Sequence, residues 1–144
     1  MTASETARLL QSHGIRCTPQ RVAVYQYLDA HRIHAPAEAI YEALVQQFAS
    51  VSRTTIYNSI RALLDGGLIR TVMIEGDFVR YDANVSAHSH FKCRRCGEVF
   101  DVMDGEAPPP PPSLHAFAVE RGELNYYGCC PVCRAQAFPG SPIV

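Results

Sequence analysis

The chain has 144 residues, which is enough for one ordinary domain or two small ones. Apolar residues make up 47% of it, so a packed core is expected and wholesale disorder is excluded. The formal net charge is -1, so any nucleic-acid binding must depend on where the arginines lie rather than on bulk charge. The sequence has no apolar stretch of membrane-spanning length, and its N-terminus is unlike a secretory signal, so we expect an intracellular, cytoplasmic protein.

The first 30 residues predict two helices. Apolar positions between Ala7 and Ile15 repeat at helical spacing, and this helix should stop near Gly14. Thr18-Pro19 then supplies an N-cap and a proline at the first position of a second helix, which runs to about Ala30.

Two further helices are expected before the pattern changes. Pro36 opens the third, whose apolar positions continue to Phe48. Ser52 or a neighbour caps the fourth, which ends at Gly66-Gly67. Strand-like runs follow at 68–74 and 78–82, joined by Glu75-Gly76-Asp77 as a hairpin. Helices followed by a two-stranded hairpin are typical of the winged helix-turn-helix module.

The second half of the chain is β-like, with expected strands at 88–93, 98–102 and 116–127. The five prolines of Pro108–Pro112 interrupt it and predict an extended spacer. We therefore predict an α+β fold, with a winged-helix domain at 1–83 and a small α/β domain at 84–144.

Two Cys-x-x-Cys pairs lie in the second half. Four thiolates at this spacing favour a closed tetrahedral zinc site, and the long gap between the pairs requires a sheet to separate them. The ligands are Cys93, Cys96, Cys130 and Cys133. A pair of redox dithiols is the alternative interpretation. Cys17 is expected to be a buried small side chain, and Cys129 to lie beside the site without binding.

A second group of residues could hold a different ion. His88 and His90 are two apart, so in a strand they face the same side. Asp82 ends the hairpin, and Asp101 lies on the expected next strand. Two imidazoles with two carboxylates suit Fe(II), Mn(II) or Zn(II). Solvated surface histidines with unrelated acids are the alternative.

The fourth predicted helix has an apolar face and a polar face. Short hydroxyl and amide side chains can contact base edges, while arginine reaches guanine or phosphate. The polar positions are Arg53, Thr54, Tyr57, Asn58 and Arg61. Arg21, on the second helix, is expected to meet phosphate together with Arg61. An ordinary amphipathic surface helix is the alternative.

An ordered set of motifs covers nearly the whole chain. It consists of Gly14-Ile15-Arg16, Thr18-Pro19-Gln20-Arg21, Ser52-x-x-Thr55-x-Tyr57, Gly67-Leu68-Ile69, Tyr81-Asp82, His88-x-His90, Cys93-x-x-Cys96-Gly97 and Tyr127-Gly128-x-Cys130-x-x-Cys133. In this set the chain resembles the ferric uptake regulator (Fur) family, whose members are dimeric bacterial transcription regulators. The resemblance implies that the N-terminal winged helix binds operator DNA and that the C-terminal domain forms a homodimer.

The resemblance also implies a regulatory metal at the hinge between the domains. It adds His34, from the loop before the third helix, as a fifth ligand to Asp82, His88, His90 and Asp101. Family members place a helix after the second strand of the dimer domain; the prolines here leave one turn, around 113–115.

Two residues bear on the branch of the family. Iron-sensing members usually carry Glu where this chain has Asp101, and commonly Arg where it has Asn58. The chain thus resembles the peroxide-sensing (PerR) branch. The sequence predicts a repressor, not an enzyme, with structural Zn2+ and regulatory Fe2+ or Mn2+. The alternative is an iron- or zinc-uptake regulator of the same family. A hydrolytic metalloenzyme is a further alternative, but the sequence offers it no evident general base.

Overall fold

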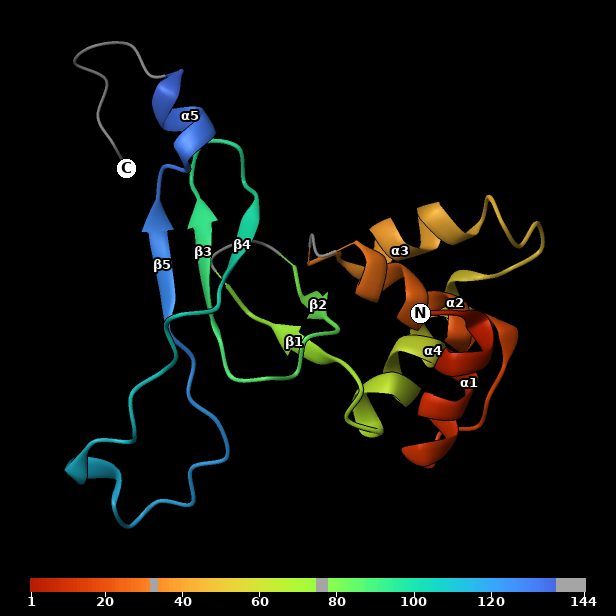
Figure 1. The fold of residues 1–144 in the computed structure, drawn as a ribbon, viewed down its shortest axis with the longest axis horizontal. Helices are drawn as coiled ribbons and strands as arrows, with labels where there is room; N and C mark the ends of the chain where they lie inside the picture. Colours follow the sequence, from red (N-terminus) through yellow and green to blue (C-terminus); the bar gives the residue numbers. More distant parts are fainter. Residues whose placement is uncertain (32–33, 75–77, 137–144) are drawn as a thin grey trace. The chain divides into compact units, whose positions relative to one another are not determined.

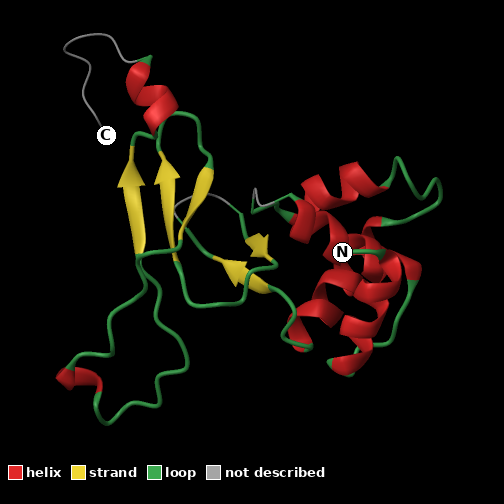
Figure 2. Cartoon of the chain, viewed as in Figure 1, coloured by secondary structure: helices red, strands yellow, loops and turns green. Residues whose placement is uncertain are grey.

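The computed structural model describes residues 1–31, 34–74 and 78–136, which form two units, Met1–Val85 and Ser86–Val144. The first unit is mainly helical with a small two-stranded sheet, and the second is built on a three-stranded sheet (Figures 1 and 2). No helix in the described ranges is long and apolar enough to cross a membrane.

Four helices make up most of the first unit: α1 (Ala3–Ser12), α2 (Pro19–Ala30), α3 (Ala37–Leu44) and α4 (Arg53–Asp65). Their ends follow the capping signals of the sequence. The Thr2 side chain accepts a hydrogen bond from the Glu5 amide, Thr18 from that of Arg21, and Ser52 from that of Thr55. The predicted stop of α4 is confirmed, because Gly66 caps it and Gly67 has a φ of 75°. The predicted extension of α3 to Phe48 is wrong, since the helix ends at Leu44, although Phe48 still packs against the core.

The core of this unit is a single apolar cluster to which all four helices contribute. Its most deeply buried members are Leu10, Val24, Ile40, Ile56 and Leu63. α2 packs against α1, α3 and α4. The buried side of α4 therefore fixes which of its side chains face outward.

A small antiparallel sheet follows α4. β1 (Arg70–Val72) pairs with β2 (Arg80–Asp82), with Arg70 opposite Asp82. The segment before α3 lies along β2, because the Tyr81 amide donates to the Ala35 carbonyl and Pro36 bridges Arg80. The predicted turn at 75–77 lies outside the described residues. The strands are shorter than predicted, and the arrangement is that of a winged helix-turn-helix.

The second unit contains β3 (Ser89–Cys93), β4 (Val99–Val102), a 3-10 turn η1 (Pro112–Leu114), β5 (Asn125–Gly128) and α5 (Pro131–Ala135). The sheet order is β4-β3-β5, with β4 antiparallel and β5 parallel to β3. Between β4 and β5 the described chain has one turn of helix, as the prolines predicted. The predicted strand at 116–127 is wrong except at its end, because β5 begins only at Asn125 and the stretch 115–123 is exposed. None of the strands in the described ranges pairs with that stretch.

Candidate metal sites and nucleic-acid interface

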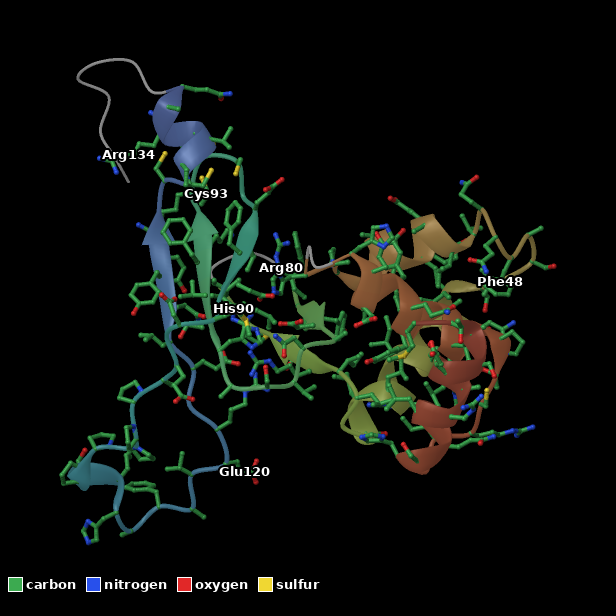
Figure 3. All side chains as sticks on the ribbon, in the orientation of Figure 1. Phe48, Arg80, His90, Cys93, Glu120 and Arg134 are labelled. Atoms are coloured by element: carbon green, nitrogen blue, oxygen red, sulfur yellow. The ribbon has the colours of Figure 1, made fainter. Side chains whose placement is uncertain are left out.

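The four predicted zinc ligands converge at one end of the second unit's sheet. One sulfur from each of Cys93, Cys96, Cys130 and Cys133 lies within 4.8 Å of the others, and Figure 3 shows sulfur atoms gathered around Cys93. Cys93 ends β3, and the Cys130 side chain caps α5 by accepting from the Cys133 amide. The parallel register of β3 and β5 sets Cys93 opposite Gly128, two residues before Cys130. Strand pairing thus brings together two motifs that are distant in the sequence.

The surroundings of the Cys93 sulfur favour its thiolate, whereas those of Cys133 do not. Burial raises the pKa of Cys93, but hydrogen bonds from the backbone amides of Cys130, Cys96 and Arg95 outweigh it and lower that pKa to about 6. The hydrogen bond with Cys130 and then burial raise the pKa of Cys133 to about 12. Four neighbouring thiols cannot all ionise without a cation among them.

The donor set also fits zinc by size. Cys96 Sγ and Cys130 Sγ are 3.9 Å apart. Zinc bound tetrahedrally by thiolates at about 2.3 Å requires sulfurs roughly 3.8 Å apart. The other two cysteines lie outside this set: Cys129 is half-buried, and Cys17 is exposed, which corrects the prediction that it would be buried. Cys17 lies in the connection before α2, away from the helical faces that form the core.

A second donor group lies further along the same sheet. Asp101 is directly opposite His90 in the β3–β4 register. Its Oδ1 lies 3.2 Å from His88 Nε2 and 3.5 Å from His90 Nε2, and the two Nε2 atoms are 3.1 Å apart. His88 and His90 are buried. The three side chains therefore converge on one point, and the two histidines face the same side, as their two-residue spacing predicted.

Backbone contacts orient the first of these imidazoles. His88 Nδ1 lies 2.7 Å from the Ser86 carbonyl oxygen, which can only accept, so Nδ1 carries the proton. In the neutral imidazole the lone pair is then on Nε2, the atom that faces His90 and Asp101. A histidine that donates through one nitrogen to a carbonyl is oriented to bind a metal through the other.

The first unit contains a buried histidine–aspartate pair, which offers the same kinds of donor atom. His34 Nε2 lies 3.3 Å from Asp82 Oδ2, and both side chains are at most 2% exposed. The other carboxylate oxygen accepts a hydrogen bond from the Asn84 amide. His34 has a φ of 54°, a left-handed conformation that residues other than glycine seldom adopt and that costs about 1–3 kcal/mol. Backbone outliers of this kind cluster at functional sites.

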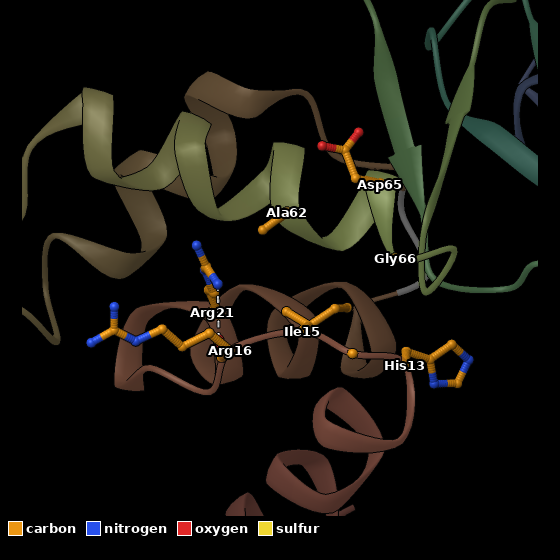
Figure 4. A pocket seen from close by; sticks show the side chains of 8 residues that line it. His13, Ile15, Arg16, Arg21, Ala62, Asp65 and Gly66 are labelled. Carbon is orange, nitrogen blue, oxygen red and sulfur yellow. Dashed lines mark hydrogen bonds between the residues drawn. The ribbon is translucent and has the colours of Figure 1, made fainter.

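The outward face of α4 presents the predicted DNA-binding side chains. Arg53, Thr54, Tyr57, Asn58 and Arg61 are all exposed, whereas Ile56, Ser59, Ile60 and Leu63 are buried. Arg21 is half-buried on α2 and donates through Nη1 to the Arg16 carbonyl. It lines a hollow of about 380 Å³ beside Ala62 and Asp65, near the C-terminal end of α4 (Figure 4). Arg21 and Arg53 thus lie near opposite ends of α4.

Sequence reasoning did not single out one residue that contacts this candidate interface. Glu38, in the first turn of α3, accepts hydrogen bonds from Arg53 and from the Tyr57 hydroxyl. The hydrogen bond from Arg53 holds the pKa of Glu38 below its usual range. An acidic residue in a first helical turn is common, so its sequence position carried no signal.

The fold and the two donor groups define a class: winged-helix transcription regulators that contain bound metal. The model of the ferric uptake regulator family matches residues 12–112. The chain belongs to that family. It is 32% identical over 136 residues to the peroxide-responsive repressor PerR of Staphylococcus epidermidis, covering 92% of this chain and 90% of the relative.

Solved structures agree with this assignment. The PerR of Streptococcus pyogenes is 28% identical, with a TM-score of 0.52, over 91% of this chain and 92% of that one. The Fur of Helicobacter pylori has a TM-score of 0.66 over 93% of this chain and 95% of its own, at 18% identity, and so supports the fold alone.

Proposed function

We propose that this protein is a metal-dependent repressor that binds operator DNA as a homodimer and releases it when peroxide oxidises a regulatory histidine. The observation that carries the proposal is the convergence of His88 and His90 on the Asp101 carboxylate. Regulation of transcription follows from the family; the response to peroxide is the specific part. It is supported by Asp101 and by the PerR relatives, which are peroxide-responsive repressors.

The regulatory ion in this proposal is Fe2+ or Mn2+, held by donors from both units. The first unit offers two donor side chains and the second offers three. Each number is smaller than the number of ligands that these ions usually bind. The full set is His34, Asp82, His88, His90 and Asp101. Nitrogen and carboxylate donors suit a borderline ion, whereas the four thiolates suit zinc.

The proposed response is a chemical change in one imidazole. Ferrous ion, when bound, would lend an electron to open the O–O bond of peroxide and would recover it as the ring is oxidised, whereas Mn(II) does not readily do so. The two electrons that reduce peroxide would thus come from the imidazole: one oxygen atom would replace the hydrogen on a ring carbon of His34 or His88, and the other would leave as water with that hydrogen. The Ser86 carbonyl holds the His88 ring in place while Nε2 faces the donors. An oxidised ring no longer offers the same lone pair, so the ligand is lost.

Ligand loss would be transmitted to DNA through the shared ion. His34 and Asp82 belong to the unit that carries α4, and the other three donors belong to the second unit. An ion bound by all five favours one arrangement of the two units, and losing it removes that bias. DNA binding then falls because the DNA-competent arrangement is less populated.

The second unit supports the proposed homodimer. Val99 is the one buried aliphatic side chain among its described residues. Phe100, Tyr126 and Tyr127, all on strands of its sheet, are exposed, and β5 is an edge strand. A sheet with so little core of its own needs a covering surface, which a second copy would supply.

As a DNA-binding regulator without a catalytic role, the protein would act in the cytoplasm.

The test compares iron and manganese. Protein loaded anaerobically with Fe(II) or Mn(II) is exposed to peroxide, and DNA binding is measured on duplexes selected by the metal-loaded protein from a random library. We expect iron-loaded protein to lose binding and to gain one oxygen atom on a peptide that contains His34 or His88. The manganese form should keep both its binding and its mass, and the exposed His115 serves as the internal control.

Replacing Asp101 with Glu sharpens the test. This variant should retain metal-dependent DNA binding and become less sensitive to peroxide. If iron-loaded wild-type protein keeps binding DNA after peroxide and no histidine is modified, the peroxide response is refuted. The alternative, an iron- or zinc-uptake regulator with reversible metal binding, would then apply.

A further inference from the structure

Glu38 organises a network at the start of the DNA-facing helix. Arg53 donates to its carboxylate through Nη2 at 2.8 Å and through Nε at 3.2 Å. The guanidinium also lies over the Tyr41 ring, 4.4 Å from the ring centroid. Tyr57, one helical turn beyond Arg53, donates its hydroxyl to the same carboxylate at 3.3 Å. One acid on α3 therefore fixes two exposed side chains of α4.

The contacts leave a defined part of Arg53 available. A guanidinium has five N–H donors in a rigid plane. Glu38 occupies the edge formed by Nε and Nη2, and Tyr41 covers one face. Both hydrogens of Nη1 and the second hydrogen of Nη2 remain at the far end. Two parallel donors at that end match O6 and N7 of guanine in the major groove.

The charge of the pair favours a base over a phosphate. Arg53 and Glu38 together carry no net charge, so the pair gains little from neutralising a phosphate or releasing counterions. The directional donors of Arg53 are unaffected by this. Arg61, in contrast, is an exposed arginine of the same helix with no hydrogen-bond or ion-pair partner among the described contacts.

On energetic grounds the network contributes little to folding. The Arg53 and Glu38 side chains are 57% and 47% exposed, and exposed ion pairs contribute little to stability. Its effect is instead to restrict the rotamers of a long side chain before any ligand arrives. Such restriction lowers the entropy lost on binding.

We propose that Glu38 is a specificity-determining positioning residue, which presents Arg53 for guanine recognition and orients Tyr57 beside it. The inference rests on the proposed DNA binding and adds the base class that is read and the residue that sets it. Removing the carboxylate would leave Arg53 mobile and uncompensated. It would then bind phosphates on any sequence, so specificity would fall while non-specific affinity rises.

The test begins with duplexes selected from a random library by wild-type protein loaded with Mn(II). Affinities of Glu38→Gln are then measured on the selected duplex and on an unrelated duplex. Glu42→Gln, an exposed acid one turn further along α3, is the matched control. We expect Glu38→Gln to lower the ratio of specific to non-specific affinity by about tenfold or more, the value of a good bidentate contact. The control should leave the ratio unchanged.

Base substitution identifies the contact. Replacing a selected guanine with 7-deazaguanine removes the N7 acceptor. At the position that Arg53 contacts, this replacement should lower the affinity of the wild-type protein but not that of Arg53→Ala. Arg53→Lys, which keeps the charge and a donor but not the planar guanidinium, should lose less affinity than the wild type at that position. Thermal unfolding of each variant checks that the fold is unchanged.

The outcomes separate the two proposals. If wild-type protein selects no sequence, the proposed DNA binding fails, and this inference fails with it. If wild-type protein selects a sequence but Glu38→Gln retains its specificity ratio, or weakens equally on every duplex, only the role of Glu38 is refuted.

Discussion

Replacing Cys96 with Ser should remove the zinc and unfold the second unit while leaving the first unit folded. The reason lies in how little else stabilises that unit. Burial of Val99, its one buried aliphatic side chain in the described part, contributes about 1.5–3 kcal/mol. A structural zinc site contributes roughly 10–16 kcal/mol of apparent binding free energy at neutral pH. The first unit has its own apolar cluster and no share in the thiolate site.

Hydrogen exchange with zinc analysis can measure this. Amides of β3 and β5 should lose protection in Cys96→Ser, and those of α2 and α4 should keep it. Cys129→Ser, which changes a half-buried cysteine outside the set, should retain zinc and protection throughout. A Cys96→Ser protein that holds one zinc per chain, with β3 protected as in the wild type, would refute the reasoning.

Two further predictions concern the first unit. Asn58→Ala should lose roughly 1–3 kcal/mol of DNA-binding free energy at particular base pairs, whereas Arg61→Ala should weaken binding on every duplex. Fluorescence anisotropy with duplexes that differ at single base pairs distinguishes the two results. A uniform loss of affinity for Asn58→Ala would instead make Asn58 a contact to the DNA backbone. Gly66→Ala should destabilise the protein by about 1–3 kcal/mol, because an added Cβ would come 2.5 Å from Ile15 Cγ1 and closer to Cδ1. In denaturant titrations, Ile15→Val should restore part of the stability lost in Gly66→Ala. It should not restore the stability lost in Gly67→Ala, because the cost there is a φ of 75° and not a clash. Equal recovery of both variants would contradict this account.

The sequence predicted best where short-range chemistry decides the structure. Capping at Thr18 and Ser52 set the starts of α2 and α4, and the two-residue spacing of His88 and His90 set their common face. The residues of the thiolate cluster were recognisable because few other structures require two Cys-x-x-Cys pairs.

What could not be predicted depends on contacts between distant residues. The stretch before Asn125 has a strand-like composition, but strands form only where a partner is available. The pairing of Glu38 with Arg53 requires knowing how α3 packs against α4. The positive φ of His34 likewise arises from the fold around it, because nothing in the local sequence demands that conformation.

β3 carries one proposed ligand of each metal site, with His90 and Cys93 three residues apart on one strand. At about 3.3 Å per residue, the two donors are separated by roughly 10 Å of paired backbone. If zinc is what keeps β3 paired with β5, newly made chains can present the histidines only after they have acquired zinc. The supply of one metal would then control how many molecules can respond to another. Under the proposed function, genes controlled by this protein would be expressed in a zinc-starved cell as though peroxide were present.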